Sequence, residues 1–128
     1  LASGFLLFRP SRYASGELDS FAKCLAERGA VMYGAAWCPH CQNEKKRFGD
    51  SFKFIPYVEC PDEPQKCLAA GIGGYPTWIF PDPSTSPSAA SSGPSGSGQA
   101  WKKLEGEQGI KKLSEESGCS LEVENKTK

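Results

Sequence analysis

Two cysteines separated by two residues, Cys38 and Cys41, lie within the segment Trp-Cys-Pro-His-Cys at positions 37–41. Cysteines at this spacing can form and break a disulfide within one helical turn. A second segment, Gly-Tyr-Pro-Thr-Trp-Ile at positions 74–79, contributes Pro76, and a later proline usually accompanies such a cysteine pair. We therefore predict that this chain carries out dithiol–disulfide exchange.

The residues around Cys38 predict that it lies at the start of a helix. Residues 31–36 have the β-branched and aromatic content of a short buried strand, whereas residues 39–48 favour a helix that stops at Gly49. Pro39 would occupy the first helical position, where its missing N–H is no loss. The remaining amides of that first turn would then point towards the Cys38 sulfur.

This position makes Cys38 the predicted attacking cysteine, because a thiolate is the reactive form in disulfide exchange. The helix dipole and the partly cationic His40 would both stabilise its thiolate. A stabilised thiolate favours the reduced form, which makes the disulfide a strong oxidant. Cys41, one turn further into the helix, is the predicted resolving cysteine.

A zinc site is the main alternative for a Cys-x-x-Cys pair, and Cys60 with Cys67 could supply the other two ligands. Structural zinc pairs usually have roughly two to four residues between the cysteines, whereas Cys60 and Cys67 have six. A purely structural disulfide between Cys38 and Cys41 is less favoured still, since so short a loop adds little stability. Exchange chemistry therefore remains the leading interpretation, and we expect no metal ligands in this chain.

Composition agrees with one small domain. The chain has 128 residues, no net charge and no basic stripe, so nothing indicates a nucleic acid partner. Six cysteines in so short a chain suggest an oxidising compartment. We expect a linker or tether at residues 1–16, the domain at residues 17–118 and a flexible tail at residues 119–128. An apolar run near the N-terminus, residues 5–8, is too short to span a bilayer.

Three segments of the chain together resemble a known family. They are Met-Tyr-Gly-Ala-Ala-Trp-Cys-Pro-His-Cys-Gln-Asn-Glu-Lys-Lys-Arg-Phe-Gly at positions 32–49, Tyr-Val-Glu-Cys at positions 57–60 and Gly-Tyr-Pro-Thr-Trp-Ile at positions 74–79. The chain resembles the thioredoxin-like domain attached to vitamin K epoxide reductase homologues of photosynthetic organisms. The resemblance runs from about Phe21 to Phe80 and continues weakly from Trp101 to Gly118.

The resemblance implies a function. Such a domain oxidises client proteins that carry free cysteines, in an extracytoplasmic oxidising compartment such as the thylakoid lumen or the bacterial periplasm. It holds no cofactor of its own and passes electrons to a quinone through a membrane-embedded vitamin K epoxide reductase-like domain, fused or separate. It also implies that Cys38 attacks, that Cys41 resolves and that Pro76 is a cis-proline facing them. One departure from ordinary thioredoxins is Met32, which replaces the buried acid expected six residues before the first cysteine.

The expected fold is α/β and thioredoxin-like, with a central mixed sheet of about four strands flanked by helices and an additional N-terminal helix. Apolar spacing and breakers predict helices at 18–26, 39–48, 63–70 and 107–117, and strands at 31–36, 55–59, 77–80 and 100–104. The strand at 55–59 should run parallel to the first, because the active-site helix is the crossover. Residues 81–98 are almost wholly Pro, Ser, Ala and Gly, and we expect a disordered insertion between the last two strands.

Three aromatic residues lie close to the predicted chemistry. Trp78 alternates with its neighbours on a buried strand and is expected in the core. Trp37 and Tyr75 each directly precede a residue that must face the substrate, so both are expected to line a shallow groove for an extended polypeptide. Pro76 is the third expected substrate-binding residue, because a cis bond between Tyr75 and Pro76 would turn the chain sharply and leave the preceding backbone groups free to pair with a substrate strand.

The remaining four cysteines include one pair that is predicted to be structural and one whose pairing stays open. Cys60 and Cys67 are near enough in sequence to bridge, and we favour a disulfide between them over free thiols. Cys24 and Cys119 could pair and link the two ends of the domain, although the sequence cannot choose among the possible pairings.

Two other functions stay open, a thioredoxin-type reductase and a zinc-stabilised or redox-inert peptide-binding module.

Overall fold

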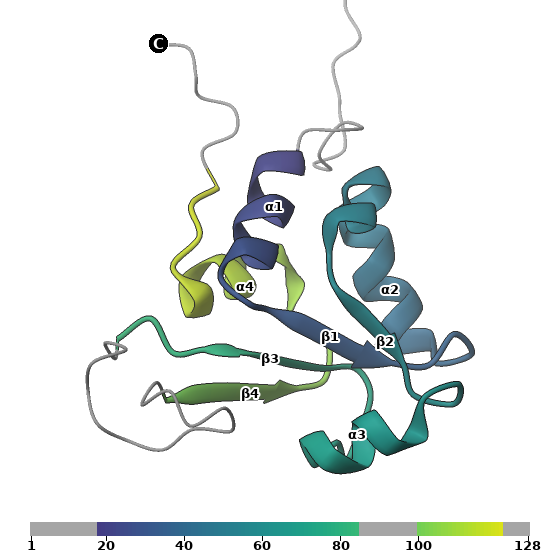
Figure 1. Cartoon of the computed structure of the whole chain (residues 1–128). Helices are drawn as coiled ribbons and strands as arrows, with labels where there is room; N and C mark the ends of the chain where they lie inside the picture. Colours follow the sequence, from purple (N-terminus) through teal and green to yellow (C-terminus); the bar gives the residue numbers. More distant parts are fainter. Residues whose placement is uncertain (1–17, 85–99, 122–128) are drawn as a thin grey trace, which may run out of the picture.

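The computed structural model describes residues 18–84 and 100–121, and these form a four-stranded mixed sheet with helices on both faces (Figure 1). The strands are β1 (Val31–Gly34), β2 (Tyr57–Glu59), β3 (Thr77–Pro81) and β4 (Trp101–Glu105), in the order β2-β1-β3-β4. β1 and β2 are parallel, as predicted, and the other two pairs are antiparallel. The central strand β1 therefore ends beside both β2 and β3.

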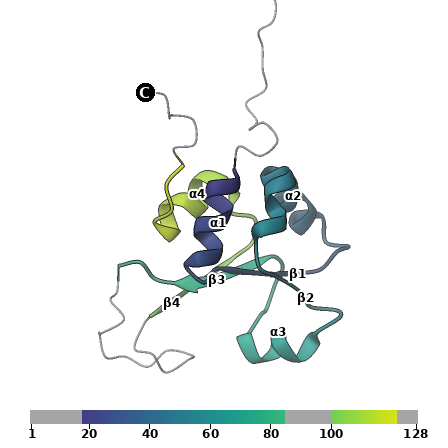
Figure 2. The same ribbon diagram turned by 45° about the horizontal axis from the view of Figure 1, so that its top comes forward.

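The helices are α1 (Asp19–Glu27), α2 (Pro39–Phe48), the 3-10 helix η1 (Gly49–Phe54), α3 (Pro64–Ala70) and α4 (Gly109–Ser117). Figure 2 shows α1, α2 and α4 on one face of the sheet and α3 on the other. This arrangement confirms the predicted thioredoxin-like α/β fold, including the additional N-terminal helix. None of the helices within the described ranges is long and apolar enough to cross a membrane.

The core lies between the sheet and the three helices on its better-covered face. Its centre contains Phe21 from α1, Met32 from β1, Trp78 from β3 and Leu113 from α4, all essentially excluded from solvent. Trp78 is therefore a core residue, as its place in the strand predicts. Met32 packs among these apolar side chains in the position where a thioredoxin would have an acid.

The second strand is shorter than predicted. The prediction places it at 55–59, but only Tyr57–Glu59 pair with β1, and residues 55 and 56 connect it to η1, which ends at Phe54. Pro56 has no N–H to donate to a strand ladder, although its carbonyl accepts a hydrogen bond from the Met32 N–H at 3.0 Å. Ile55 instead closes η1 by donating to the Phe52 carbonyl.

Other element boundaries differ by one or two residues, which is ordinary for helix and strand ends. β1 stops at Gly34 rather than 36, β4 begins at Trp101 rather than 100, and α3 begins at Pro64 rather than 63. α4 begins at Gly109 rather than 107, because the two preceding residues are held by side chains of α2. This last difference matters for the site described below.

Two segments predicted to be flexible include residues that hold a defined place in the structure. Pro81 belongs to β3 and pairs with Trp101, and the Asp82 N–H donates to the Ala100 carbonyl, so these two residues do not belong to the disordered insertion expected at 81–98. Cys119 is buried and disulfide-bonded, so a tail starting at residue 119 was wrong for that residue. The tether expected at 1–16, residues 85–98 of the insertion and residues 122–128 of the tail lie outside the described residues.

Candidate active site

Cys38 lies at the N-cap of α2, just beyond the end of β1, and Pro39 occupies the first turn. The turn that delivers it is fixed by hydrogen bonds. The Cys38 N–H donates to the Ala35 carbonyl at 3.1 Å, and the Ala36 N–H donates to the Glu59 carboxylate at 2.8 Å. A strand that runs directly into a helix start therefore places the Cys38 sulfur at the positive end of the helix dipole.

Pro76 faces this cysteine from the start of β3. The Tyr75–Pro76 bond is cis in the structure, and the Cys38 Sγ lies 3.9 Å from the Tyr75 carbonyl oxygen. The turn is held from both sides, since Thr77 Oγ1 donates to the Gly74 carbonyl at 2.7 Å and the Gly106 N–H donates to the Pro76 carbonyl at 2.7 Å. The fold thus brings together residues that are far apart in the sequence, as the pairing of β1 with β3 requires.

Cys41 lies behind Cys38, with no exposed surface, and both are free thiols in this structure. Its sulfur packs directly on Gly34, where an added Cβ atom would lie only 2.6 Å from Sγ. Burial raises the pKa of Cys41 to about 11, against a lowering by the backbone at Ala35, while the neighbouring Cys38 raises it further. Cys41 is therefore the more sheltered thiol of the pair.

A tyrosine and a carboxylate border the buried thiol on the β2 side. Tyr57 donates from its hydroxyl to Glu59 at 2.5 Å, and the Lys45 ammonium lies 4.1 Å from the Tyr57 ring centroid. Burial, reinforced by Glu59, raises the pKa of Tyr57. Conversely, the hydrogen bond from Tyr57 lowers the pKa of Glu59. Glu59 was not singled out in the sequence as a site residue, because nothing local links it to the turn at Ala36.

His40 is exposed and points its Nδ1 atom at Glu107, with 2.5 Å between Nδ1 and Oε1. Asn43 and Arg47 also donate to this carboxylate, at 3.2 Å and 2.7 Å. These bonds, with that from His40 the strongest, lower the pKa of Glu107 to about 2. Glu107 was expected at the start of the last helix, so its approach to His40 could not be read from the sequence.

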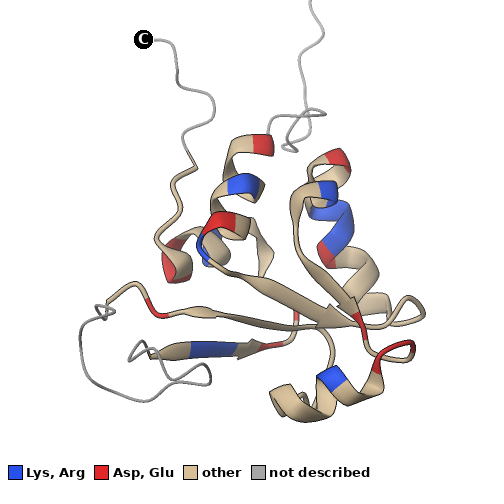
Figure 3. Cartoon of the chain, in the orientation of Figure 1, with Lys and Arg blue, Asp and Glu red and all other residues tan. Residues whose placement is uncertain are grey.

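The basic residues of α2 gather in its C-terminal half (Figure 3).

Glu44 is the only buried charged side chain within residues 18–84 and 100–121. Its carboxylate accepts from the Trp78 indole N–H at 2.8 Å and from the backbone N–H groups of Gln108 and Gly109 at 2.8 Å and 3.0 Å. It therefore caps the start of α4, where a negative charge complements the helix dipole. This buried acid differs in place from that of thioredoxins and was not expected from the sequence.

Trp37 and Tyr75 lie next to one another at the surface beside Cys38. Their rings make an edge-to-face contact with centroids 5.9 Å apart, and Trp37 is 67% exposed. An exposed tryptophan held by a second aromatic ring offers an apolar contact to an incoming chain. The structure thus brings together the two residues that the sequence assigned to substrate binding.

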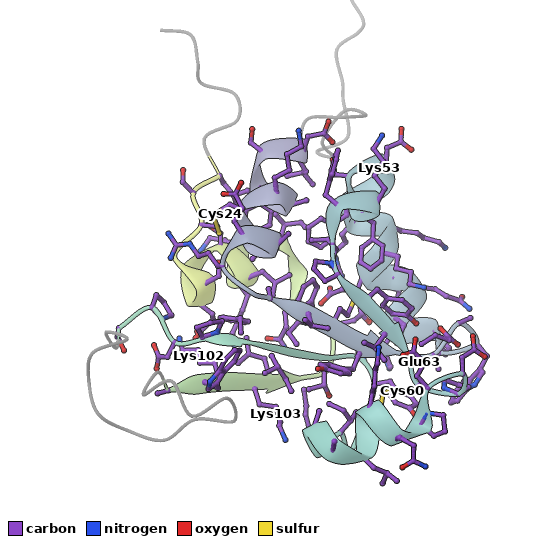
Figure 4. All side chains as sticks on the ribbon, in the orientation of Figure 1. Cys24, Lys53, Cys60, Glu63, Lys102 and Lys103 are labelled. Carbon is purple, nitrogen blue, oxygen red and sulfur yellow. A yellow bond between two sulfur atoms is a disulfide. The ribbon has the colours of Figure 1, made fainter. Side chains whose placement is uncertain are left out.

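The other four cysteines form two disulfides, Cys24–Cys119 and Cys60–Cys67. The first bond joins α1 to Cys119, just after α4, and Cys60 lies beside α3 (Figure 4). Cys60 and Cys67 are thus bonded to each other, whereas the zinc alternative needs both as metal ligands. The described residues hold no cluster of three or more side chains suited to a metal ion.

Known proteins include a relative of this chain. No protein-family model matches the chain. The sequence is 38% identical over 117 residues to thiol-disulfide oxidoreductase LTO1 of Arabidopsis thaliana, a match that covers 84% of this chain and 26% of the relative. A crystal structure of chloroplastic thioredoxin z aligns with a TM-score of 0.46 and 17% identity, covering 88% of this chain and 96% of that one. The chain spans about a quarter of the length of this curated relative. By this match, the chain is a homologue of the thiol-disulfide oxidoreductase LTO1.

Proposed function

We propose that this chain is a protein thiol oxidase domain whose Cys38–Cys41 disulfide takes two electrons from client dithiols. The observation that carries the proposal is the position of the Cys38 thiol, at the start of α2 and facing the carbonyl that precedes cis-Pro76. Cys38 is 6% exposed whereas Cys41 is 0% exposed. One sulfur that a client can reach, with a sheltered partner behind it, is what disulfide exchange requires.

The reaction proceeds in two exchanges. A client thiolate attacks Cys38, the Cys38–Cys41 bond breaks, and Cys41 leaves as a thiolate that takes up a proton. The second client thiolate then attacks the client sulfur of the mixed disulfide, and Cys38 leaves. The client gains one disulfide, the domain becomes a dithiol, and two electrons and two protons have moved. Burial, the main cause of the raised pKa of Cys41, persists in the mixed disulfide and favours the protonated thiol, which limits its attack back on that bond.

Client chains are expected to contact Trp37, Tyr75 and Pro76. The exposed Trp37 ring, braced by Tyr75, provides apolar contact surface next to the attacking sulfur. The Tyr75 backbone lies beside Cys38 and can pair with an extended client segment, as edge backbone groups do in strand-addition complexes. Pairing through backbone groups does not depend on the side chains of the client, so it suits many different clients.

The reduced domain needs an electron acceptor outside itself. By its resemblance to the thioredoxin-like domain of vitamin K epoxide reductase homologues, we propose that electrons pass to a quinone through such a membrane-embedded partner, fused or separate. The two further disulfides support an oxidising location, for which the thylakoid lumen or the bacterial periplasm is proposed.

A glutathione redox titration of the Cys38–Cys41 pair tests the direction of the reaction. An oxidase should be clearly more oxidising than thioredoxin, whose potential is about −270 mV, and should lie towards the strong-oxidant end near −120 mV. A value at or below that of thioredoxin would make the domain a reductase. Cys41→Ser should accumulate mixed disulfides with clients, whereas Cys38→Ser should not, and the reverse pattern would exchange the two roles.

A turnover assay tests the need for a partner. The oxidised chain alone, without oxygen or glutathione, should oxidise one equivalent of a reduced client and then stop. Adding membranes that contain a quinone-linked vitamin K epoxide reductase homologue should restore turnover, with Cys38→Ser as the inactive control. Sustained oxidation by the isolated chain would contradict the proposal.

A further inference from the structure

Glu107 lies in the connection between β4 and α4, yet three side chains of α2 converge on its carboxylate. His40 Nδ1 lies at 2.5 Å, Arg47 at 2.7 Å and Asn43 at 3.2 Å. Residues 40, 43 and 47 share one face of a helix, since side chains spaced by three or four positions are neighbours. A fixed carboxylate therefore lies along the same helix that presents Cys38 and Cys41.

The backbone around Glu107 is held on several sides. The next two N–H groups, of Gln108 and Gly109, donate to the buried Glu44 carboxylate. The Gln108 side chain donates back to the carbonyls at 105 and 106, at 3.1 Å and 2.9 Å. The Gly106 N–H donates to the Pro76 carbonyl. This connection is therefore hydrogen-bonded both to α2, through Glu44, and to the cis-proline turn, through Pro76. These bonds hold Glu107 beside His40.

The contact changes what His40 can do for Cys38. An imidazolium next to a thiol favours the thiolate, but an imidazolium paired with a carboxylate has a much smaller net field at a distance. Among the described residues, the charged side chain in contact with His40 is Glu107 from the β4–α4 connection. Arg47 from α2 contacts the same carboxylate and also that of Glu44. The positive charge of a protonated His40 would therefore be paired with the Glu107 carboxylate.

We propose that Glu107 is a positioning residue that holds His40 as its counter-ion and so makes the Cys38–Cys41 disulfide less oxidising than an unpaired His40 would. The inference rests on the proposed function, because it concerns the same dithiol. In equilibrium with glutathione, two glutathione thiols become one glutathione disulfide while the Cys38–Cys41 bond is reduced to two thiols. Anything that stabilises the Cys38 thiolate shifts this equilibrium towards the reduced chain.

The test is the glutathione equilibrium constant of the full chain at about pH 6, where an imidazole without an anionic neighbour is largely protonated. Glu107→Gln keeps the shape of the side chain and removes its charge. We expect the equilibrium to shift towards the reduced chain by about threefold to tenfold. Glu105→Gln is the matched control, because it removes the same charge two residues earlier from an exposed side chain beside Gly73. It should shift the equilibrium by less than about twofold.

The same substitution in a His40→Ala background separates this role from a purely structural one. Without the imidazole, Glu107→Gln should change the equilibrium by less than about twofold, whereas a loss of folding support would lower the melting temperature in both backgrounds. No shift in the wild-type background, a shift towards the oxidised chain, or an equal shift without His40 would overturn the inference. A wild-type chain that does not exchange with glutathione would instead overturn the proposed function.

Discussion

Replacing Glu44 by alanine should destabilise the protein strongly, and the size of the loss can be worked from its contacts. The carboxylate accepts hydrogen bonds from the Trp78 indole and from the N–H groups of Gln108 and Gly109, and Arg47 lies 3.3 Å from it. Each buried donor left without a partner costs about 1–3 kcal/mol. Trp78 is fully buried, whereas the two backbone groups at the start of α4 can regain water in part.

Counting the indole in full and the two backbone groups in part gives a loss of about 3–5 kcal/mol for Glu44→Ala, the range found when one member of a buried charged pair is removed. Small domains have only about 5–15 kcal/mol of total stability, so this is a large share. Glu44→Gln should lose less, about 1–3 kcal/mol, because its carbonyl oxygen still accepts while its NH₂ group faces other donors.

The assay is urea denaturation of the oxidised chain, followed by circular dichroism, with the midpoint and slope compared between variants. Glu115→Ala is the control, since Glu115 is exposed and its ion pair with Lys111 is a surface pair, so it should change stability by less than about 0.5 kcal/mol. A loss below about 1 kcal/mol for Glu44→Ala would refute the reasoning, because it would mean that water satisfies the donors as well as the carboxylate does.

Three further predictions follow from single contacts. Gly34→Ala should place a Cβ atom 2.6 Å from the Cys41 sulfur, and this clash should lower stability by about 1–3 kcal/mol. The same clash should slow closure of the active-site disulfide. Closure at the wild-type rate in a rapid-mixing oxidation assay would contradict this prediction. Replacing Cys24 and Cys119 together by serine opens a link across 95 residues and should lower stability in urea by about 4–5 kcal/mol, while leaving client oxidation by the remaining folded protein intact. The lowered pKa of Glu107 contributes stability that is present above its unfolded pKa of about 4.3 and is lost as pH falls towards about 2. In urea titrations between about pH 5 and pH 2, the wild-type chain should therefore lose more stability than Glu107→Gln. Equal losses in the two proteins would contradict this prediction.

The sequence by itself determined the local chemistry. Cys38, Pro39 and Cys41 follow one another at a helix start, and a strand with β-branched and aromatic residues leads directly into that helix. These are short-range features, governed by propensity, capping and turn chemistry, which act within a few residues. For the same reason the order of strands and helices was predictable to within a few positions at most boundaries.

Only the tertiary structure decided which distant groups surround that chemistry. Pro76 reaches Cys38 because β3 pairs with β1, and Glu107 reaches His40 because the β4–α4 connection packs against α2. Glu44 gave no local sign of burial, since an acid on a helix is usually solvated. The three N–H donors that surround its carboxylate, from Trp78, Gln108 and Gly109, lie more than thirty positions away. Hydrogen-bond partners of this kind depend on packing between elements, and sequence periodicity reports only which face of each element is buried.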